Sequence, residues 1–300
     1  MMEKAIITGG SGLVGQSVAR HLTSNGISVL CIGRSFLSQA DVRKKFGTGV
    51  TYLQLDIKDI IDLPKKIENI NWESGCNCVF YHFAWSGPQR LTDGSIEEQL
   101  LNVTWSSLAI KAAKNIGCSR FINSGTIEET YAEWHLKKGS KFTSSQGNYS
   151  IAKLASRDMC AMTAYLEKID YIHTRLSVPL SPDLSIGGYV SKTLKKIVSK
   201  ESYDLPNNNQ LFDIISTDDV AEAYYLLGIK GINKSNYYIG SGNPIILRDY
   251  FQQFEQYIQD ISFEEKDYSF LYASEFFKTE LLYKDTGFVS STNRFNLFKI

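Results

Sequence analysis

The feature that most constrains this chain is a glycine-rich turn close to its first residue. Gly9, Gly12 and Gly15 follow the apolar, mostly β-branched run 5–8. Beyond them, apolar residues recur at helical spacing, at Leu13, Val14, Val18 and Leu22. A strand that turns through glycines into a helix brings backbone N–H groups and the helix N-terminus against a phosphate. An ordinary glycine turn is the alternative, but the flanking strand and helix favour a dinucleotide pyrophosphate site.

Strand-like and helix-like segments then alternate along the chain. Apolar runs of strand length lie at 28–32, 50–54, 78–82, 120–123 and 171–176. Apolar spacing of i, i+3 and i+4 marks helices at 97–116, 148–167 and 186–200. The alternation predicts an α/β fold of the Rossmann type: a doubly wound parallel sheet, helices on both faces, and a ligand crevice at the carboxyl ends of the strands.

This regular alternation weakens from about residue 177, and the tail of the chain is rich in aromatic residues. We therefore predict a dinucleotide-binding Rossmann domain over 1–176 and a smaller C-terminal lobe over 177–300, which caps the cofactor. Because 212–215 resembles a strand and 217–221 a capped helix start, we expect one return to the main sheet near 212–228.

Composition excludes several classes of partner. With 32 basic and 32 acidic residues, the chain has no general attraction to nucleic acid or to an anionic membrane. No apolar run approaches the roughly 18 residues of a membrane span. Residues 1–4 lead into a predicted core strand rather than into a secretory signal, so we expect a cytoplasmic protein.

Five cysteines, an odd number, lie mostly in apolar segments and fit reduced buried thiols better than a disulfide framework. Cys76 and Cys78 have no second Cys/His pair at ligand spacing, so no metal site is expected.

The strongest candidate for chemistry is the pair Tyr149 and Lys153. Their four-residue spacing places a phenol and an ammonium on one face of a helix. The ammonium would favour the phenolate and lower the pKa of Tyr149, so that it exchanges a proton with a carbonyl or alcohol near neutral pH. One such spacing is expected by chance in a chain with 17 tyrosines, and Tyr149 alone has it.

Hydroxyl groups follow the fifth predicted strand, at the expected crevice. Either Ser124 or Thr126 could hydrogen-bond the reacting oxygen that Tyr149 serves. A turn-capping role is the alternative for one of them.

Together, the glycine turn, this hydroxyl and the Tyr-x-x-x-Lys helix resemble the extended short-chain dehydrogenase/reductases. More narrowly, the chain resembles their NAD(P)-dependent nucleotide-sugar epimerase/dehydratase/reductase group. Further segments carry the resemblance in the same order along the chain: 55–57, 82–85, 102–103, 175–179, 216–221 and 238–242.

The resemblance implies specific roles. Tyr149 would be the acid/base, Lys153 would bind the nicotinamide ribose and tune Tyr149, and Thr126 would polarise the substrate oxygen. The C-terminal lobe over 177–300 would mainly bind the sugar nucleotide. The implied cofactor-binding residues are Gly9, Gly12, Leu13, Val14, Gly15, Arg34, Asp56, Ile57, Ala84, Asn102, Ser124 and Lys153. The implied substrate-binding candidates are Trp85, Arg90, Glu129, Arg175 and Arg248; an exposed glutamate at a helix start is the equal alternative for Glu129.

Two segments depart from the pattern. The strand-six motif usually continues into Gly-Pro, whereas this chain has Leu180-Ser181-Pro182. The aromatic that usually follows the Gly-Thr-x-x-Glu stretch is displaced, with Thr130 before Tyr131.

The end of the second strand bears on the cofactor. An acidic residue there would favour NAD, whereas this chain has Arg34, whose guanidinium suits a 2′-phosphate. NADP is therefore favoured; Arg34 stacked over the adenine would allow NAD.

We accordingly expect NADPH-dependent reduction of the C4 ketone of a nucleoside-diphosphate 4-keto-6-deoxy sugar. The alternative is an NAD-dependent nucleotide-sugar 4-epimerase or 4-dehydrogenase. A non-catalytic dinucleotide sensor would typically have lost Tyr149 or Lys153, and both are present.

The resemblance also implies a homodimer in which the helices near 97–116 and 148–167 pair with their symmetry mates. The candidate lining residues are Leu100, Leu101, Leu108, Ile110, Ala113, Leu154 and Met162. The alternative places all of them in the core of one chain.

Overall fold

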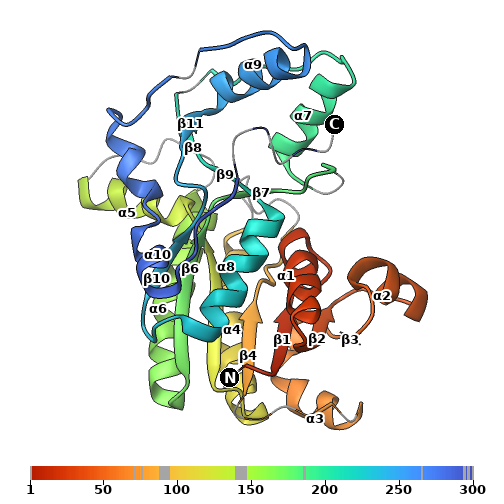
Figure 1. The fold of residues 1–300 in the computed structure, drawn as a ribbon. Helices are drawn as coiled ribbons and strands as arrows, with labels where there is room; N and C mark the ends of the chain where they lie inside the picture. Colours follow the sequence, from red (N-terminus) through yellow and green to blue (C-terminus); the bar gives the residue numbers. More distant parts are fainter. Residues whose placement is uncertain are drawn as a thin grey trace.

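The structure is a computed structural model that describes residues 2–70, 72–73, 75, 77–87, 95–138, 147–184, 187–207, 209–264, 266–292, 295 and 298. A sheet flanked by helices forms its lower part, and a smaller lobe lies above the carboxyl ends of the strands (Figure 1). The first described residues lie at the amino ends of the strands, opposite this lobe.

Seven parallel strands form the main sheet in the order β10-β6-β5-β4-β1-β2-β3. Their bounds are β1 Lys4–Thr8, β2 Ser28–Gly33, β3 Val50–Gln54, β4 Cys78–His82, β5 Arg120–Thr126, β6 Asp170–Leu176 and β10 Asn236–Ile239. β1 lies between β2 and β4, so the glycine turn leaves the sheet where the strand order reverses. The predicted Rossmann-type fold is confirmed.

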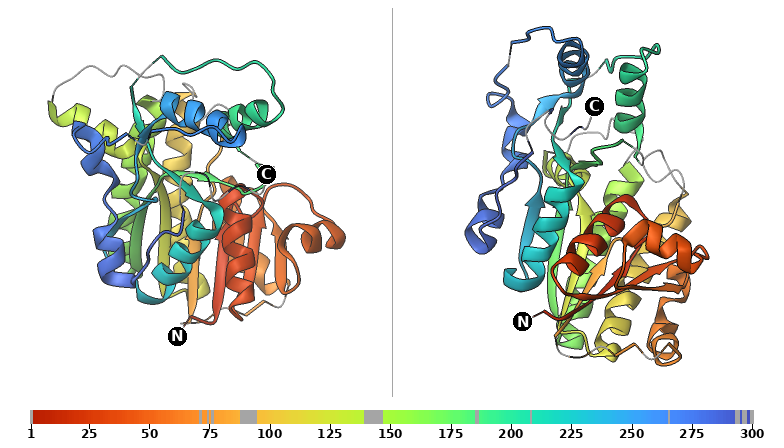
Figure 2. Two further views of the ribbon diagram at one scale, coloured as in Figure 1. Left: turned by 45° about the horizontal axis from the view of Figure 1, so that its top comes forward. Right: turned by 45° about the vertical axis from the view of Figure 1, so that its right-hand side comes forward.

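Helices cover both faces of this sheet (Figure 2). On one face α1 (Leu13–Ser24) packs against α8 (Thr217–Lys230), and on the other α4 (Ile96–Ile116) packs against α6 (Gly147–Glu167). Side chains of β1 alternate between the two cores: Ile7 joins the core beneath α1 and α8, and Ile6 joins the core beneath α4 and α6. The helix α2 (Gln39–Phe46) packs on α1 and β3, whereas η1 (Ile57–Asp62) and α3 (Leu63–Glu68) pack on α4.

The upper lobe has a third core, which is rich in aromatic side chains such as Tyr250, Phe251 and Phe254. There α7 (Tyr189–Val198) packs against α9 (Leu247–Ile258). Two short strand pairs complete it, β7 (Val178–Leu180) with β9 (Ile214–Ser216) and β8 (Leu211–Phe212) with β11 (Ile245–Ile246). The remaining elements are α5 (Glu128–Lys138), η2 (Tyr272–Phe277) and α10 (Glu280–Thr286).

Within the predicted return near 212–228, α8 packs on the main sheet beside α1, and only the strand expected at 212–215 needs a correction. The segment 212–215 forms parts of β8 and β9 and does not join the seven-stranded sheet. The buried carboxylate of Asp213 accepts hydrogen bonds from the hydroxyl of Tyr238 in β10, and from the Ser241 hydroxyl and the Gly242 N–H group just beyond that strand. This segment is therefore held above the sheet. After α8, the strand that joins the main sheet is β10, which pairs with β6. The division at residue 177 stays a prediction.

Apolar residues of α4 and α6 divide between core and surface. Ile110, Ala113 and Leu154 are buried within the chain, which removes them as dimer contacts. Leu100, Leu101 and Met162 are exposed and stay candidates for a contact with a second copy. None of the helices in the described ranges is both long and apolar enough to cross a bilayer.

Candidate active site

The glycine turn has the tight geometry that a pyrophosphate cradle needs. Gly9 has a φ of 70°, and a Cβ atom there would lie 2.8 Å from the backbone nitrogen of Ala84. A Cβ on Gly15 would overlap the carbonyl oxygen of Gly9, which accepts a hydrogen bond from the Gly12 N–H group at 3.0 Å. The turn therefore packs α1 directly onto β1 and β4, and only glycine fits at either position.

Side chains of β3 hold the end of β2 in place. The Tyr52 hydroxyl donates to the Ser35 carbonyl at 2.7 Å, and the Gln54 amide donates to the Arg34 carbonyl at 3.1 Å. Arg34 itself is exposed. Asp56 caps η1 by accepting from the Lys58 N–H group at 3.1 Å, next to the half-buried Ile57. The predicted adenosine contacts thus lie along the ends of two neighbouring strands.

The loop after β4 is tied to α4. The Asn102 side-chain amide makes two hydrogen bonds with the backbone of Ser86: it accepts from the N–H group at 2.7 Å and donates to the carbonyl at 3.1 Å. The Trp85 indole N–H donates to Gln99 at 3.0 Å. Asn102 is buried, whereas Ala84 and Trp85 are half-buried. A fixed loop at this edge can present both residues to a bound ligand.

His82, the last residue of β4, connects this strand to β1 and α4. Its ring nitrogens lie 2.8 Å from the Thr8 hydroxyl and 3.0 Å from the Ser106 hydroxyl. Complete burial, together with the positive charge of Lys153, lowers the pKa of His82 to about 3. The imidazole is therefore neutral at physiological pH and acts as a hydrogen-bonding brace between β1, β4 and α4.

Tyr149 and Lys153 lie together at this edge, as predicted. Both are almost entirely buried, at 8% and 7% exposure. The Lys153 ammonium donates to the Ser124 carbonyl at 2.9 Å and lies 5.9 Å from the centre of the Tyr149 ring. The Trp85 ring stands perpendicular to Tyr149, with 6.0 Å between ring centres. A phenol, an ammonium and an aromatic wall thus meet beside the end of β5.

The two candidate hydroxyls have different surroundings. The Ser124 hydroxyl accepts from the Tyr224 hydroxyl of α8 at 3.1 Å, so it is engaged towards the other face of the sheet. The Thr126 hydroxyl accepts from the Glu128 N–H group at 3.4 Å, so it is engaged only within its own turn. Both hydroxyls accept in these contacts and keep their own proton, and the difference between them is that Ser124 is directed towards α8. This difference favours Thr126 over Ser124 for the hydroxyl role.

The NAD dependent epimerase/dehydratase family model matches residues 5–240, a range that includes the glycine turn, Thr126, Tyr149 and Lys153. The chain belongs to this family.

Solved structures share the fold of this family member at low identity. The UDP-glucose 4-epimerase of Thermotoga maritima, solved with UDP-glucose, is 17% identical with a TM-score of 0.72, over 98% of this chain and 96% of that one. The Bordetella bronchiseptica enzyme WbmG, solved with NAD and UDP, is 16% identical with a TM-score of 0.71, over 98% and 91%. The UDP-N-acetylglucosamine 4-epimerase of Methanobrevibacter ruminantium, solved with UDP-N-acetylmuramic acid, is 19% identical with a TM-score of 0.67, over 86% and 83%.

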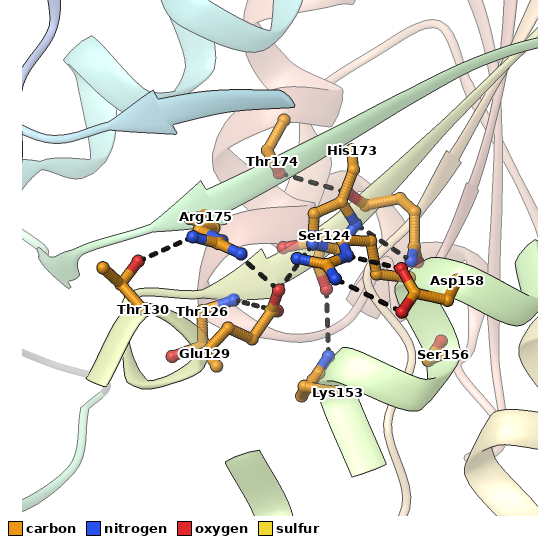
Figure 3. A network of polar contacts seen from close by, with 12 residues as sticks. Ser124, Thr126, Glu129, Thr130, Lys153, Ser156, Asp158, His173, Thr174 and Arg175 are labelled. Carbon is orange, nitrogen blue, oxygen red and sulfur yellow. Dashed lines mark hydrogen bonds and ion pairs between the residues drawn. The ribbon is translucent and has the colours of Figure 1, made fainter. Parts of the chain in front are cut away.

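The surroundings of Glu129 differ from both sequence expectations, a sugar contact and an exposed helix start. It is wholly buried: one oxygen accepts from the Thr126 N–H group at 2.9 Å, and the other lies 2.8 Å from His173 Nε2. Arg175 Nε approaches the same carboxylate at 3.5 Å. Figure 3 shows this network beneath the end of β5. The arrangement favours a structural role for Glu129 over both an exposed helix start and a sugar contact.

The three arginines that the sequence predicted as substrate contacts differ in their surroundings. Arg175 donates to Thr130 at 2.9 Å (Figure 3) and to Glu133 at 2.6 Å, so its guanidinium is already held by protein groups. Arg248, at the start of α9 in the upper lobe, donates to Asn209 at 3.3 Å and is partly exposed. Arg90 lies outside the described residues. A ligand contact of Arg248 stays a prediction.

The sequence analysis did not identify the buried polar groups that bind Glu129, which in turn binds the Thr126 N–H group. His173 and Asn123 are buried neighbours in adjacent strands, 3.3 Å apart, and His173 links Asn123 to Glu129. Burial also raises the pKa of Glu128, next to the Thr126 turn, to about 7. Polar residues inside otherwise apolar strands, such as Asn123 and His173, were the available signal.

Among the described residues, no group of three or more His, Cys, Asp or Glu side chains could hold a metal ion. Cys31, Cys78, Cys118 and Cys160 are free and buried, as expected for reduced thiols. Cys76 lies outside the described residues.

Proposed function

We propose that this family member is an NAD-dependent nucleotide-sugar 4-epimerase. The observation that carries the proposal is the meeting of Tyr149, Lys153 and the end of β5 beside the glycine turn. The 4-epimerase names and the UDP ligands of the similar structures support it. A 4-dehydrogenase would use the same residues and stop after sugar oxidation.

The residues at the turn fit a dinucleotide. Gly9 and Gly15 leave no room for a Cβ, so the turn packs tightly between β1 and the N-terminus of α1, where backbone N–H groups would receive a pyrophosphate. The bound cofactor would accept the C4 hydride of the sugar and later return it to the opposite face. Lys153 would hold the nicotinamide ribose, and Asp56 and Ile57 would border the adenine.

The chain's own side chains would manage the proton. Tyr149, as phenolate, takes the proton of the C4 hydroxyl while Thr126 donates a hydrogen bond to the same oxygen. The sugar then exists as a 4-ketone, and after it rotates Tyr149 returns the proton to the C4 oxygen. Lys153 would offset the negative charge of Tyr149 in its phenolate form, before it takes the proton and after it returns it.

A second candidate is the NADPH-dependent reduction of a 4-keto sugar nucleotide that the sequence suggested first. The observation in its favour is Arg34, an exposed cation where a carboxylate would mark NAD. A reductase would use Tyr149 and Thr126 in the same positions, with Tyr149 donating its proton.

Identifying the co-purified cofactor separates the two candidates. We expect stoichiometric NAD in the mass spectrum of denatured protein, and interconversion of C4 epimers of a UDP-hexose without added cofactor. Empty protein that binds NADPH far more tightly than NADH and reduces 4-keto sugar nucleotides would overturn the epimerase in favour of the reductase.

Arg34→Glu tests whether this side chain contacts the 2′-phosphate of NADPH or stacks on the adenine. We expect NADPH affinity to fall at least about tenfold, while NADH affinity stays within roughly threefold, because a carboxylate repels a 2′-phosphate but can accept from a 2′-hydroxyl. Isothermal titration calorimetry measures both constants, with Arg20→Glu on the exposed side of α1 as a control. Equal losses for both cofactors would instead indicate stacking on the adenine.

We also propose that the exposed apolar residues of α4 and α6 pair two copies of the chain. Leu100, Leu101 and Met162 would be covered by the symmetry-related helices. Sedimentation equilibrium is expected to give twice the chain mass, and Met162→Glu to shift the protein to monomer. A wild-type monomer at micromolar concentration would contradict the pairing.

A cytoplasmic location stays a prediction.

A further inference from the structure

Trp85 contacts both side chains of the catalytic pair. The Lys153 ammonium lies 3.8 Å from the centre of the Trp85 ring, within the range of a strong cation–π contact. The same ring meets Tyr149 edge-on at 6.0 Å. Lys153 is 7% exposed, so water screens this contact little. The ammonium is therefore held between an electron-rich ring and the Ser124 carbonyl.

The indole has a fixed orientation of its own. Its N–H group donates to Gln99, which is buried on α4. The next residue, Ser86, is bound through its backbone to Asn102 and through its hydroxyl to Glu98 at 3.0 Å. Three hydrogen-bonding residues of one helix thus fix the loop that carries Trp85. A ring whose orientation is fixed by a hydrogen bond can restrain the flexible Lys153 side chain that lies over it.

We propose that Trp85 is a positioning residue that holds the Lys153 ammonium in place for Tyr149 and the cofactor ribose. This role rests on the proposed function and replaces the sugar contact expected for Trp85 from the sequence. Without the ring, the four-carbon Lys153 side chain would sample other rotamers, and its charge would lie beside the Tyr149 oxygen for a smaller share of the time.

The test compares Trp85→Leu with Trp85→Phe. We expect the leucine variant to lose about tenfold in kcat with KM for the sugar nucleotide nearly unchanged, and the pH profile of kcat to move towards higher pH. The phenylalanine variant, which keeps a ring beneath the ammonium, is expected to recover most of both effects. Trp72→Leu is the matched control, because Trp72 also lies beneath a lysine, Lys4, but at the amino end of β1.

The outcomes separate this inference from the proposed function. A rise in KM with unchanged kcat and pH profile would overturn the positioning role and restore the sugar contact. If the wild-type protein turns over no nucleotide sugar, the proposed function fails, and fluorescence tests the contact by itself. The Trp85 emission, obtained by subtracting the Trp85→Phe spectrum, should change in Lys153→Met; an unchanged emission would overturn the contact.

Discussion

Replacing Tyr149 with Phe is expected to lower kcat by roughly a thousandfold, while cofactor affinity changes by less than about threefold. The substitution keeps the ring that faces Trp85 and removes only the hydroxyl that exchanges a proton with the sugar C4 oxygen. The remaining turnover would come from binding and orientation alone. Steady-state kinetics with a UDP-hexose, together with calorimetric titration of the cofactor, measures the two quantities.

The matched control for this prediction lies on the same helix. Tyr165 is exposed near the end of α6, and Tyr165→Phe is expected to retain wild-type kinetics. A Tyr149→Phe variant with more than about a tenth of the wild-type kcat would contradict the acid/base role and direct attention to Glu128. The pKa of Glu128, raised to about 7 by burial, would suit it to exchange protons at neutral pH.

Replacing Glu129 with Gln is expected to reduce the free energy of unfolding by about 3 kcal/mol. The carboxylate is wholly buried, and the variant would leave His173 and Arg175 without their shared negative partner. Urea unfolding followed by circular dichroism measures the loss. Glu133→Gln is the control: this half-buried carboxylate pairs with Arg157 and Arg175, and its loss is expected to cost about 1 kcal/mol.

The pH dependence of the same variant gives a second readout. Burial alone would raise the pKa of Glu129, but the charge and hydrogen bond of His173, with Arg175 and the Thr126 N–H group, hold it below the ordinary value of 4.5. A pKa lower in the folded than in the unfolded chain contributes stability above that ordinary value, and the contribution is lost as the pH falls through the folded pKa. The urea midpoint of the wild type should therefore fall more steeply below about pH 4.5 than that of Glu129→Gln. Parallel curves would show that this carboxylate does not titrate differently on folding.

Features that depend on neighbouring residues could be predicted from the sequence. The strand β1, the glycine turn and the helix α1 follow from the spacing at which apolar residues recur and from the backbone freedom of Gly9 and Gly15. The four-residue spacing of Tyr149 and Lys153 placed both on one face of α6, because a helix repeats every 3.6 residues. Alternation of such units gave the parallel sheet, since a crossover helix between parallel strands is right-handed and packs back on the sheet.

Tertiary structure alone decided which polar groups are buried together. Glu129 reads locally as an exposed helix start, yet the parallel register of β5 and β6 brings His173, 44 positions away, against it. Trp85 reaches Lys153 only because α4 and α6 pack on the same face of the sheet beside β4. Asp213, which looked like part of a main-sheet strand, instead binds the end of β10. Local periodicity determines the elements and their buried faces, whereas long-range register and helix packing determine which charges meet, because those contacts join residues that no local pattern links.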